Sequence, residues 1–311
     1  MKTSEISRIL KKNDIKVISY LKEDDLNVVN TNKGKFFVIE SINNKYIYNY
    51  LKSSSFDNSP KILINDNYKI IEYVENIDIP EEQKYNDFID LIAILHNKTK
   101  FDKKVLNDEY MKIYEDLENN YLYLFDYYNN IINEIDNTIF LSPSNYLIAR
   151  NISLIFDSLN LGKEYLEEWK EKILNLDKMR VCINNNNLKL SNFRRSNKSY
   201  IIDWNKSKID IPSFDLYNFF QNNNVDYFEI LKRYEKKIPL NDIERNLLFI
   251  LLLMPKTINF NLNEYDMCKS IRNNINKLIN THEMIKKREK STIKDWLFTI
   301  IFSKMIKKLE T

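Results

Sequence analysis

The stretch that decides the fold is residues 180–220, RVCINNNNLKLSNFRRSNKSYIIDWNKSKIDIPSFDLYNFF. It opens with an apolar strand at 181–183 and continues into a polar loop that leads to Asn192. Turn-forming residues at 196–198 predict a hairpin, and the second strand of that hairpin runs directly into Asp203. Because a hairpin brings its two ends together, the sequence predicts that Asn192 and Asp203 approach one another.

The spacing of this stretch resembles the catalytic segment of the aminoglycoside and choline phosphotransferases, and within that group the spore-coat CotS-like branch. Those proteins carry His-Gly-Asp, an Asn five residues after the Asp, then Ile-Asp-Trp or Ile-Asp-Phe, then Asp-Leu at the head of a helix. Here Asn192 and Asp203 match the metal-binding Asn and Asp, and Asp215 matches the Asp of the later pair. Residues 185–187 are all Asn, so the catalytic motif itself is degenerate.

The resemblance implies an α+β, two-lobe protein-kinase-like fold. Its small antiparallel-sheet N-lobe would occupy residues 1–75, and a mainly helical C-lobe with the catalytic-like segment would occupy 76–311. Before Pro80 the apolar pattern predicts helices at 4–12 and 43–54 and strands at 15–21, 27–30, 35–42, 61–64 and 68–73. After Pro80 the pattern is helical, and it includes two separate helices at 142–159 and 163–176.

The resemblance also implies a site for ATP and Mg²⁺, with Tyr73, Val74 and Ile202 around the nucleotide. Phosphoryl transfer in this group depends on a loop that covers the phosphates, a lysine on the third strand, metal ligands and a base. The loop here, residues 22–25, is Lys-Glu-Asp-Asp, which has no Gly and would repel phosphates. Asn187 stands at the position of the catalytic Asp and cannot take up a proton at neutral pH, so we expect it to be inactive.

Glu40 stands at the position of the family's lysine. One interpretation is an inverted ion pair, in which Glu40 binds Lys45 or Lys52 of the following helix and preserves the link between strand and helix. The alternative is that Glu40 points into solvent at an edge of the sheet. A carboxylate cannot neutralise nucleotide phosphates in either case, so we expect binding of ATP and Mg²⁺ to be weak or lost.

Four polar residues have structural interpretations beside the catalytic ones. Asn192 and Asp203 are the candidate metal ligands, but Asn192 could instead bind backbone groups while Asp203 caps a turn. His96 ends an apolar helical pattern, and Asp215 follows Pro212 and Ser213 at the start of a predicted helix. We expect Asp215 either to cap this helix or to brace the catalytic-like loop, and His96 to be a core or capping histidine that braces the same loop.

The sequence therefore predicts a pseudokinase that acts as a binding or assembly protein, with a bacterial spore coat or envelope as its setting by analogy to the CotS-like branch. The first alternative is an active ATP-dependent small-molecule kinase that uses Asn192 and Asp203 for Mg²⁺ together with an unorthodox base. The second is a non-enzymatic helical scaffold. The partner would be a protein or a small molecule of unknown identity.

Composition and charge limit the partners and the cellular compartment that we expect for this protein. The 47 basic and 44 acidic residues leave a net charge of only +3, so we expect no nucleic-acid partner. Cys182 and Cys268 are distant in sequence and predict thiols in a reducing compartment. The N-terminus lacks the apolar core of a signal peptide, which favours the cytoplasm. A basic amphipathic helix at 286–309 could contact an anionic membrane, although packing within the C-lobe is favoured.

Overall fold

The computed structural model describes residues 3–42, 45–105 and 107–309, with side chains described as far as residue 290 except at residue 107. By its contacts the chain forms two compact units. The first consists of Met1–Lys103, Lys178–Val225 and Arg233–Pro239, and the second of Lys104–Asp177, Asp226–Lys232 and Leu240–Thr311. The catalytic-like segment therefore belongs to the same compact unit as the N-terminal sheet.

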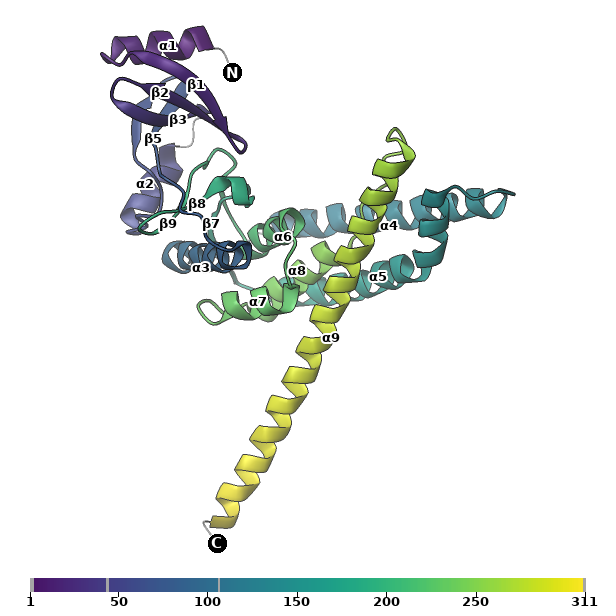
Figure 1. Ribbon diagram of the computed structural model, residues 1–311. Helices are drawn as coiled ribbons and strands as arrows, with labels where there is room; N and C mark the ends of the chain where they lie inside the picture. The colour runs from purple at the N-terminus through teal and green to yellow at the C-terminus, as the bar shows by residue number, and fades with distance from the viewer. Residues whose placement is uncertain (1–2, 43–44, 106, 310–311) are drawn as a thin grey trace. The chain divides into compact units, whose positions relative to one another are not determined.

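The first unit contains a five-stranded antiparallel sheet in the order β1-β2-β3-β5-β4, of which Figure 1 labels β1, β2, β3 and β5. Its strands are β1 (Val17–Glu23), β2 (Leu26–Thr31), β3 (Gly34–Glu40), β4 (Ile62–Asn65) and β5 (Tyr68–Glu72), with helix α2 (Lys45–Ser53) between β3 and β4. Helices dominate the rest of the described chain, so the predicted α+β class is confirmed. The boundary expected between residues 75 and 76 stays a prediction.

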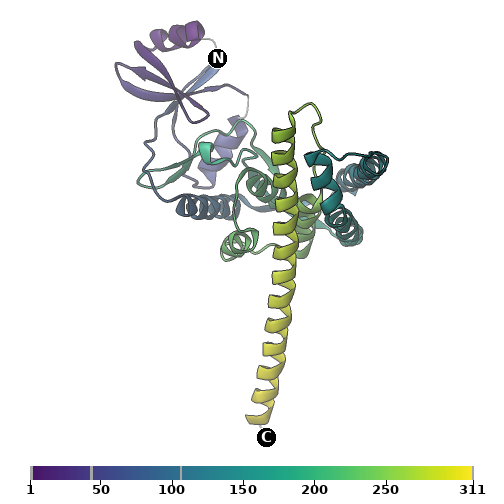
Figure 2. The same ribbon diagram turned by 45° about the vertical axis from the view of Figure 1, so that its right-hand side comes forward.

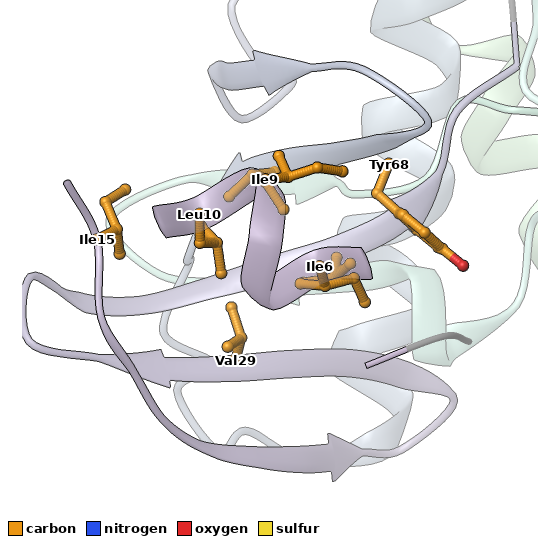
Figure 3. Packing of buried hydrophobic residues seen from close by; sticks show 8 residues of the cluster. Ile6, Ile9, Leu10, Ile15, Val29 and Tyr68 are labelled. Carbon is orange, nitrogen blue, oxygen red and sulfur yellow. The ribbon is translucent and has the colours of Figure 1, made fainter. Parts of the chain in front are cut away.

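Helix α1 (Thr3–Lys12) covers one face of this sheet. Ile6, Ile9 and Leu10 share one face of the helix because they are three and four residues apart. All three are buried against the sheet, in a cluster that includes Val29 and Tyr68 (Figure 3). This packing orients the sheet so that its other face is free to meet the catalytic-like segment.

The other face of the sheet carries a second buried cluster. Successive residues of a strand point to opposite faces, so Val28 and Phe37 lie on the face away from α1. They pack with Ile202 of the catalytic-like segment. The cluster therefore joins the sheet directly to the residue that precedes Asp203. Its buried members are Leu26, Val28, Phe37, Ile71, Val74 and Ile202.

Short strands build the catalytic-like segment. They are β7 (Lys178–Asn184), β8 (Phe193–Arg195), β9 (Ser199–Ile201) and β10 (Lys208–Asp210), with a 3₁₀ turn at Leu190–Asn192 and helix α6 (Pro212–Asn222) after them. Strands β8 and β9 pair antiparallel on either side of residues 196–198, so the predicted hairpin is confirmed. Strand β7 lies between β10 and β6 (Phe101–Lys104), and helix α3 (Glu81–Thr99) precedes β6.

The second unit consists mainly of long helices (Figure 2). They are α4 (Asn107–Asp136), α5 (Pro143–Leu174), α8 (Asp242–Leu253) and α9 (Glu264–Leu309), while α7 (Tyr227–Glu235) contributes residues to both units. Helix α5 starts where the Ser142 hydroxyl accepts a hydrogen bond from the Asn145 N–H at 3.2 Å. It continues without a break through residues 160–162, so the prediction of two separate helices there is wrong.

A close approach between helices explains the glycine inside α5. A Cβ atom added to Gly162 would lie 2.0 Å from the hydroxyl oxygen of Tyr121 on α4. Tyr121 is buried, and its hydroxyl donates a hydrogen bond to the Ile250 carbonyl at 2.7 Å. Gly162 therefore lets α4 and α5 pack closely, which outweighs the low helix propensity of glycine.

We expect Gly162→Ala to destabilise the protein by about 1–3 kcal/mol, because the added methyl group must displace the Tyr121 ring from a packed site. Urea unfolding followed by circular dichroism measures the change. Ser153→Ala, at an exposed position of the same helix, is the matched control and should change stability by less than about 0.5 kcal/mol. Equal stability of Gly162→Ala and the wild type would contradict the close approach.

The basic amphipathic helix predicted at 286–309 lies mostly outside the residues whose side chains are described. Helix α9 continues to Leu309, but the side chains of residues 291–309, which would form most of the amphipathic surface, are not described. Among the residues that the structure describes, no helix is both long and apolar enough to cross a bilayer.

Candidate functional site

The loop at 185–187 is held by one buried carboxylate. Asp215 accepts hydrogen bonds from the backbone N–H groups of Asn185 at 2.8 Å and Asn186 at 2.7 Å. It also accepts one from His96 Nε2 at 3.1 Å, and the other ring nitrogen of His96 binds the Tyr234 hydroxyl at 2.8 Å. Asp215 and His96 are both fully buried. The structure thus places both residues where the expected bracing role requires them.

Asn186 has a backbone φ of 57°, in the left-handed region. Asparagine tolerates this region better than most residues do, and glycine tolerates it best. By spacing, Asn186 stands where the His-Gly-Asp pattern has Gly, the residue that adopts this backbone conformation most readily.

Asn192 and Asp203 meet as the hairpin predicts. The Asn192 side-chain oxygen accepts a hydrogen bond from the Asp203 N–H at 2.5 Å, and its amide donates to the Asp203 carbonyl at 3.1 Å. The same amide also donates to the Asn187 carbonyl at 3.0 Å and to the Asn185 side chain at 3.2 Å. Asn187 in turn donates from its amide to Asp203 Oδ2 at 3.2 Å. The four residues form one hydrogen-bond network.

A buried lysine lies beside this network. Lys69 on β5 is 1% exposed, and its ammonium donates to the Asn205 side-chain oxygen at 3.1 Å. The Asn205 N–H donates to Asp203 Oδ1 at 2.9 Å. The ammonium also lies over the ring of Tyr48 on α2, 5.0 Å from its centre. Burial lowers the pKa of Lys69, and the Asp203 carboxylate acts in the opposite direction.

The acidic turn between β1 and β2 is bound to the catalytic-like segment. Asp24 forms an ion pair of 3.0 Å with Arg194, whose side chain is 2% exposed. Asp25 accepts a hydrogen bond from the Ser191 hydroxyl at 3.2 Å. Glu23 accepts one from the Tyr73 hydroxyl at 2.9 Å. The three acids expected to repel phosphates are therefore occupied by contacts within the protein.

Comparison with known proteins supports the fold. No protein-family model matches the chain, and no curated protein matches it. An aminoglycoside phosphotransferase from Alicyclobacillus acidocaldarius aligns with a TM-score of 0.62 at 10% identity, over 88% of this chain and 93% of its own. The chain has a protein-kinase-like fold. A choline kinase from Streptococcus pneumoniae aligns at 16% identity with a TM-score of 0.48, over 91% of this chain and 97% of its own.

In this kinase-like fold the residues predicted around the nucleotide are packed against one another. Val74 is 7% exposed and Ile202 is fully buried, and both contact the cluster that contains Phe37. Tyr73 packs on the same cluster, with its ring centre 5.0 Å from that of Phe37. Phe37, which the sequence did not single out, therefore belongs to the same buried cluster as the predicted nucleotide residues Val74 and Ile202.

The position of Glu40 differs from one expectation. Glu40 is exposed, and among the described residues it forms no ion pair with Lys45 or Lys52, so the inverted ion pair is wrong. The residue opposite Lys69 in the sheet is Ile39, whereas Glu40 lies opposite Tyr68. Strand alternation thus sends Glu40 to the α1 side of the sheet, away from the network. Its contribution to the site is the backbone carbonyl, which accepts from the Asn205 amide at 2.7 Å.

The residues present do not suit a tightly bound Mg²⁺. The Asn192 oxygen and both carboxylate oxygens of Asp203 already accept hydrogen bonds. Mg²⁺ requires near-octahedral oxygen ligands and is usually held by one or two carboxylates plus substrate phosphates. Asp203 is a single carboxylate, and in the described part of the chain no group of three or more His, Cys, Asp or Glu residues could hold a metal. The metal role of Asn192 and Asp203 stays a prediction that this geometry does not favour.

Sequence reasoning missed Lys69, Arg194 and Phe37. Lys69 and Arg194 are two of many basic residues in the chain, and Phe37 is one apolar residue of a strand. A signal was present for Lys69, since it interrupts the apolar run of a buried strand. Arg194 and Phe37 offered no comparable signal.

Proposed function

We propose that this protein is a pseudokinase, which has the phosphotransferase fold but does not transfer phosphate, and that it works as a binding or assembly protein. The observation that carries the proposal is that Phe37, Val74 and Ile202 belong to one buried apolar cluster. These side chains bury apolar surface that a nucleotide base would otherwise cover. Nucleotide binding would have to separate them, at a cost of roughly 25 cal/mol for each Å² of apolar surface exposed.

The polar part of the site supports the same function. Asn187 occupies the position of the catalytic base and donates a hydrogen bond to Asp203, so it offers no group that accepts a proton. The turn that would cover the phosphates is acidic and is paired with Arg194 and Ser191. Each departure removes a different contribution to phosphoryl transfer, and electrostatic stabilisation is usually the largest of these contributions.

The setting of the protein rests on the resemblance alone. The CotS-like spacing of residues 180–220 supports a bacterial spore coat or envelope, with a protein as the binding partner. Localisation of a fluorescently tagged copy in sporulating and growing cells would distinguish this setting from a diffuse cytoplasmic one.

We expect ATP, ADP and GTP, each with and without Mg²⁺, to leave the melting temperature of the purified protein unchanged. A ligand that binds only the folded state must raise stability, by about 2.7 kcal/mol at one hundred times its dissociation constant. Phosphate transfer to amine and hydroxyl acceptors should also be absent. The alternative of an active small-molecule kinase requires the opposite results, namely stabilisation by Mg-ATP and turnover that is lost in Asp203→Ala.

A further inference from the structure

We propose that the Lys69 ammonium takes the place of a divalent cation at Asp203, so that the site is held together by an internal charge. This proposal rests on the proposed function, because it describes how a site that does not transfer phosphate remains ordered. The position of Lys69 on β5 does not follow from the phosphotransferase pattern, in which the lysine of the site belongs to the third strand.

The first step is the placement of Lys69. It lies opposite Ile39 in the pairing of β3 with β5, and directly paired residues point to the same face of a sheet. Ile39 packs on the cluster that contains Ile202, so this face is the one toward the catalytic-like segment. The site therefore receives its lysine from β5, although β3 has none in that register.

The second step is the set of contacts that Lys69 makes. Asn205 links it to Asp203, since the Asn205 oxygen accepts from the ammonium at 3.1 Å and the Asn205 N–H donates to the carboxylate at 2.9 Å. The Tyr48 ring lies 5.0 Å from the ammonium and belongs to α2. One cation therefore connects β5, α2 and the loop that carries Asp203. A bound metal would make such a connection through ligands, whereas Lys69 makes it through hydrogen bonds and a cation–π contact.

Lys69 should also keep a divalent cation from binding at Asp203. A partly buried carboxylate needs a compensating charge, and Lys69 provides one. A divalent cation at Asp203 would lie near this ammonium and would have to displace the hydrogen bonds from Asn205 and Asn187. Two positive charges placed so close to one carboxylate would repel each other. Lys69 and a metal ion should therefore be mutually exclusive at Asp203.

The test is the Mg²⁺ dependence of thermal unfolding in Lys69→Met, which keeps an unbranched apolar side chain and removes the charge. We expect Mg²⁺ in large excess to raise the melting temperature of Lys69→Met by roughly 2 °C or more and to leave the wild type unchanged. The double variant Lys69→Met/Asp203→Asn should lose the response. Lys61→Met removes an exposed lysine next to β4 and should behave like the wild type. A folded Lys69→Met protein that ignores Mg²⁺ would overturn the proposal.

A second measurement decides the matter if Lys69→Met does not fold. Isothermal titration of the wild type with Mg²⁺ or Mn²⁺ should show no binding that depends on Asp203. Binding that disappears in Asp203→Asn would overturn the role of Lys69. If the wild type binds the metal ion in this way but still fails to transfer phosphate, the proposed function survives and only this inference is lost. Turnover of Mg-ATP by the wild type would instead overturn the proposed function.

Discussion

Replacing Asp215 by alanine is expected to destabilise the protein by about 3–5 kcal/mol, the largest effect we predict for a single polar side chain in this chain. Asp215 is fully buried and accepts three hydrogen bonds, two from the backbone of residues 185 and 186 and one from His96. Its removal leaves two buried donors and one partly buried donor without an acceptor, and each unsatisfied buried donor costs about 1–3 kcal/mol. Urea unfolding measures the change.

Two further variants make this prediction specific. Asp215→Asn keeps the shape of the side chain and one acceptor oxygen, so it should lose less stability than the alanine variant. Asp78→Ala removes a carboxylate that is 99% exposed, although it pairs with Lys84, and should change stability by less than about 1 kcal/mol. An Asp215→Ala protein as stable as Asp78→Ala would show that this carboxylate does not hold the loop.

Replacing Phe37 by alanine is expected to cost a similar amount, about 3–5 kcal/mol. Phe37 is fully buried between the sheet and the catalytic-like segment. Its ring also contacts Tyr73 and lies 5.8 Å from the guanidinium of Arg194. The substitution removes these contacts and leaves a cavity that the surrounding side chains can fill only in part.

The control for Phe37 is Phe101→Ala, because Phe101 belongs to the same unit but is 39% exposed. We expect it to lose clearly less stability in the same urea experiment. If Phe37→Ala is no more destabilised than Phe101→Ala, then the predicted nucleotide residues are not tightly packed. The main support for the pseudokinase proposal would then be lost.

Much of the site could be predicted because its signals are local. The hairpin between Asn192 and Asp203 depends on turn residues a few positions apart, and their contact follows from chain geometry. The spacing of residues 180–220 also led to the correct fold class, which the TM-score of 0.62 supports at only 10% identity. The inability of Asn187 to take up a proton is likewise a matter of residue type, since an amide has the same chemistry in any fold.

The errors have a common origin in contacts between distant parts of the chain. Residues 160–162 looked like a helix break, but contact with Tyr121 on another helix favours a glycine inside α5. Counting residues along the chain placed Glu40 at the position where the phosphotransferase pattern has a lysine. Pairing with β5 then placed Ile39 on the inner face and left Glu40 exposed.

The sequence by itself therefore determined most of the strand and helix pattern, the hairpin that joins Asn192 to Asp203, and the amide side chain at position 187. Only the tertiary structure decided which cation lies beside Asp203, which side chains share a buried cluster with Val74 and Ile202, and what the acidic turn binds. Lys69 and Asp203 are 134 residues apart, and Asp24 and Arg194 are 170 residues apart. Side-chain partners at such separations depend on sheet register and on the packing of one element against another, which short-range sequence patterns do not encode.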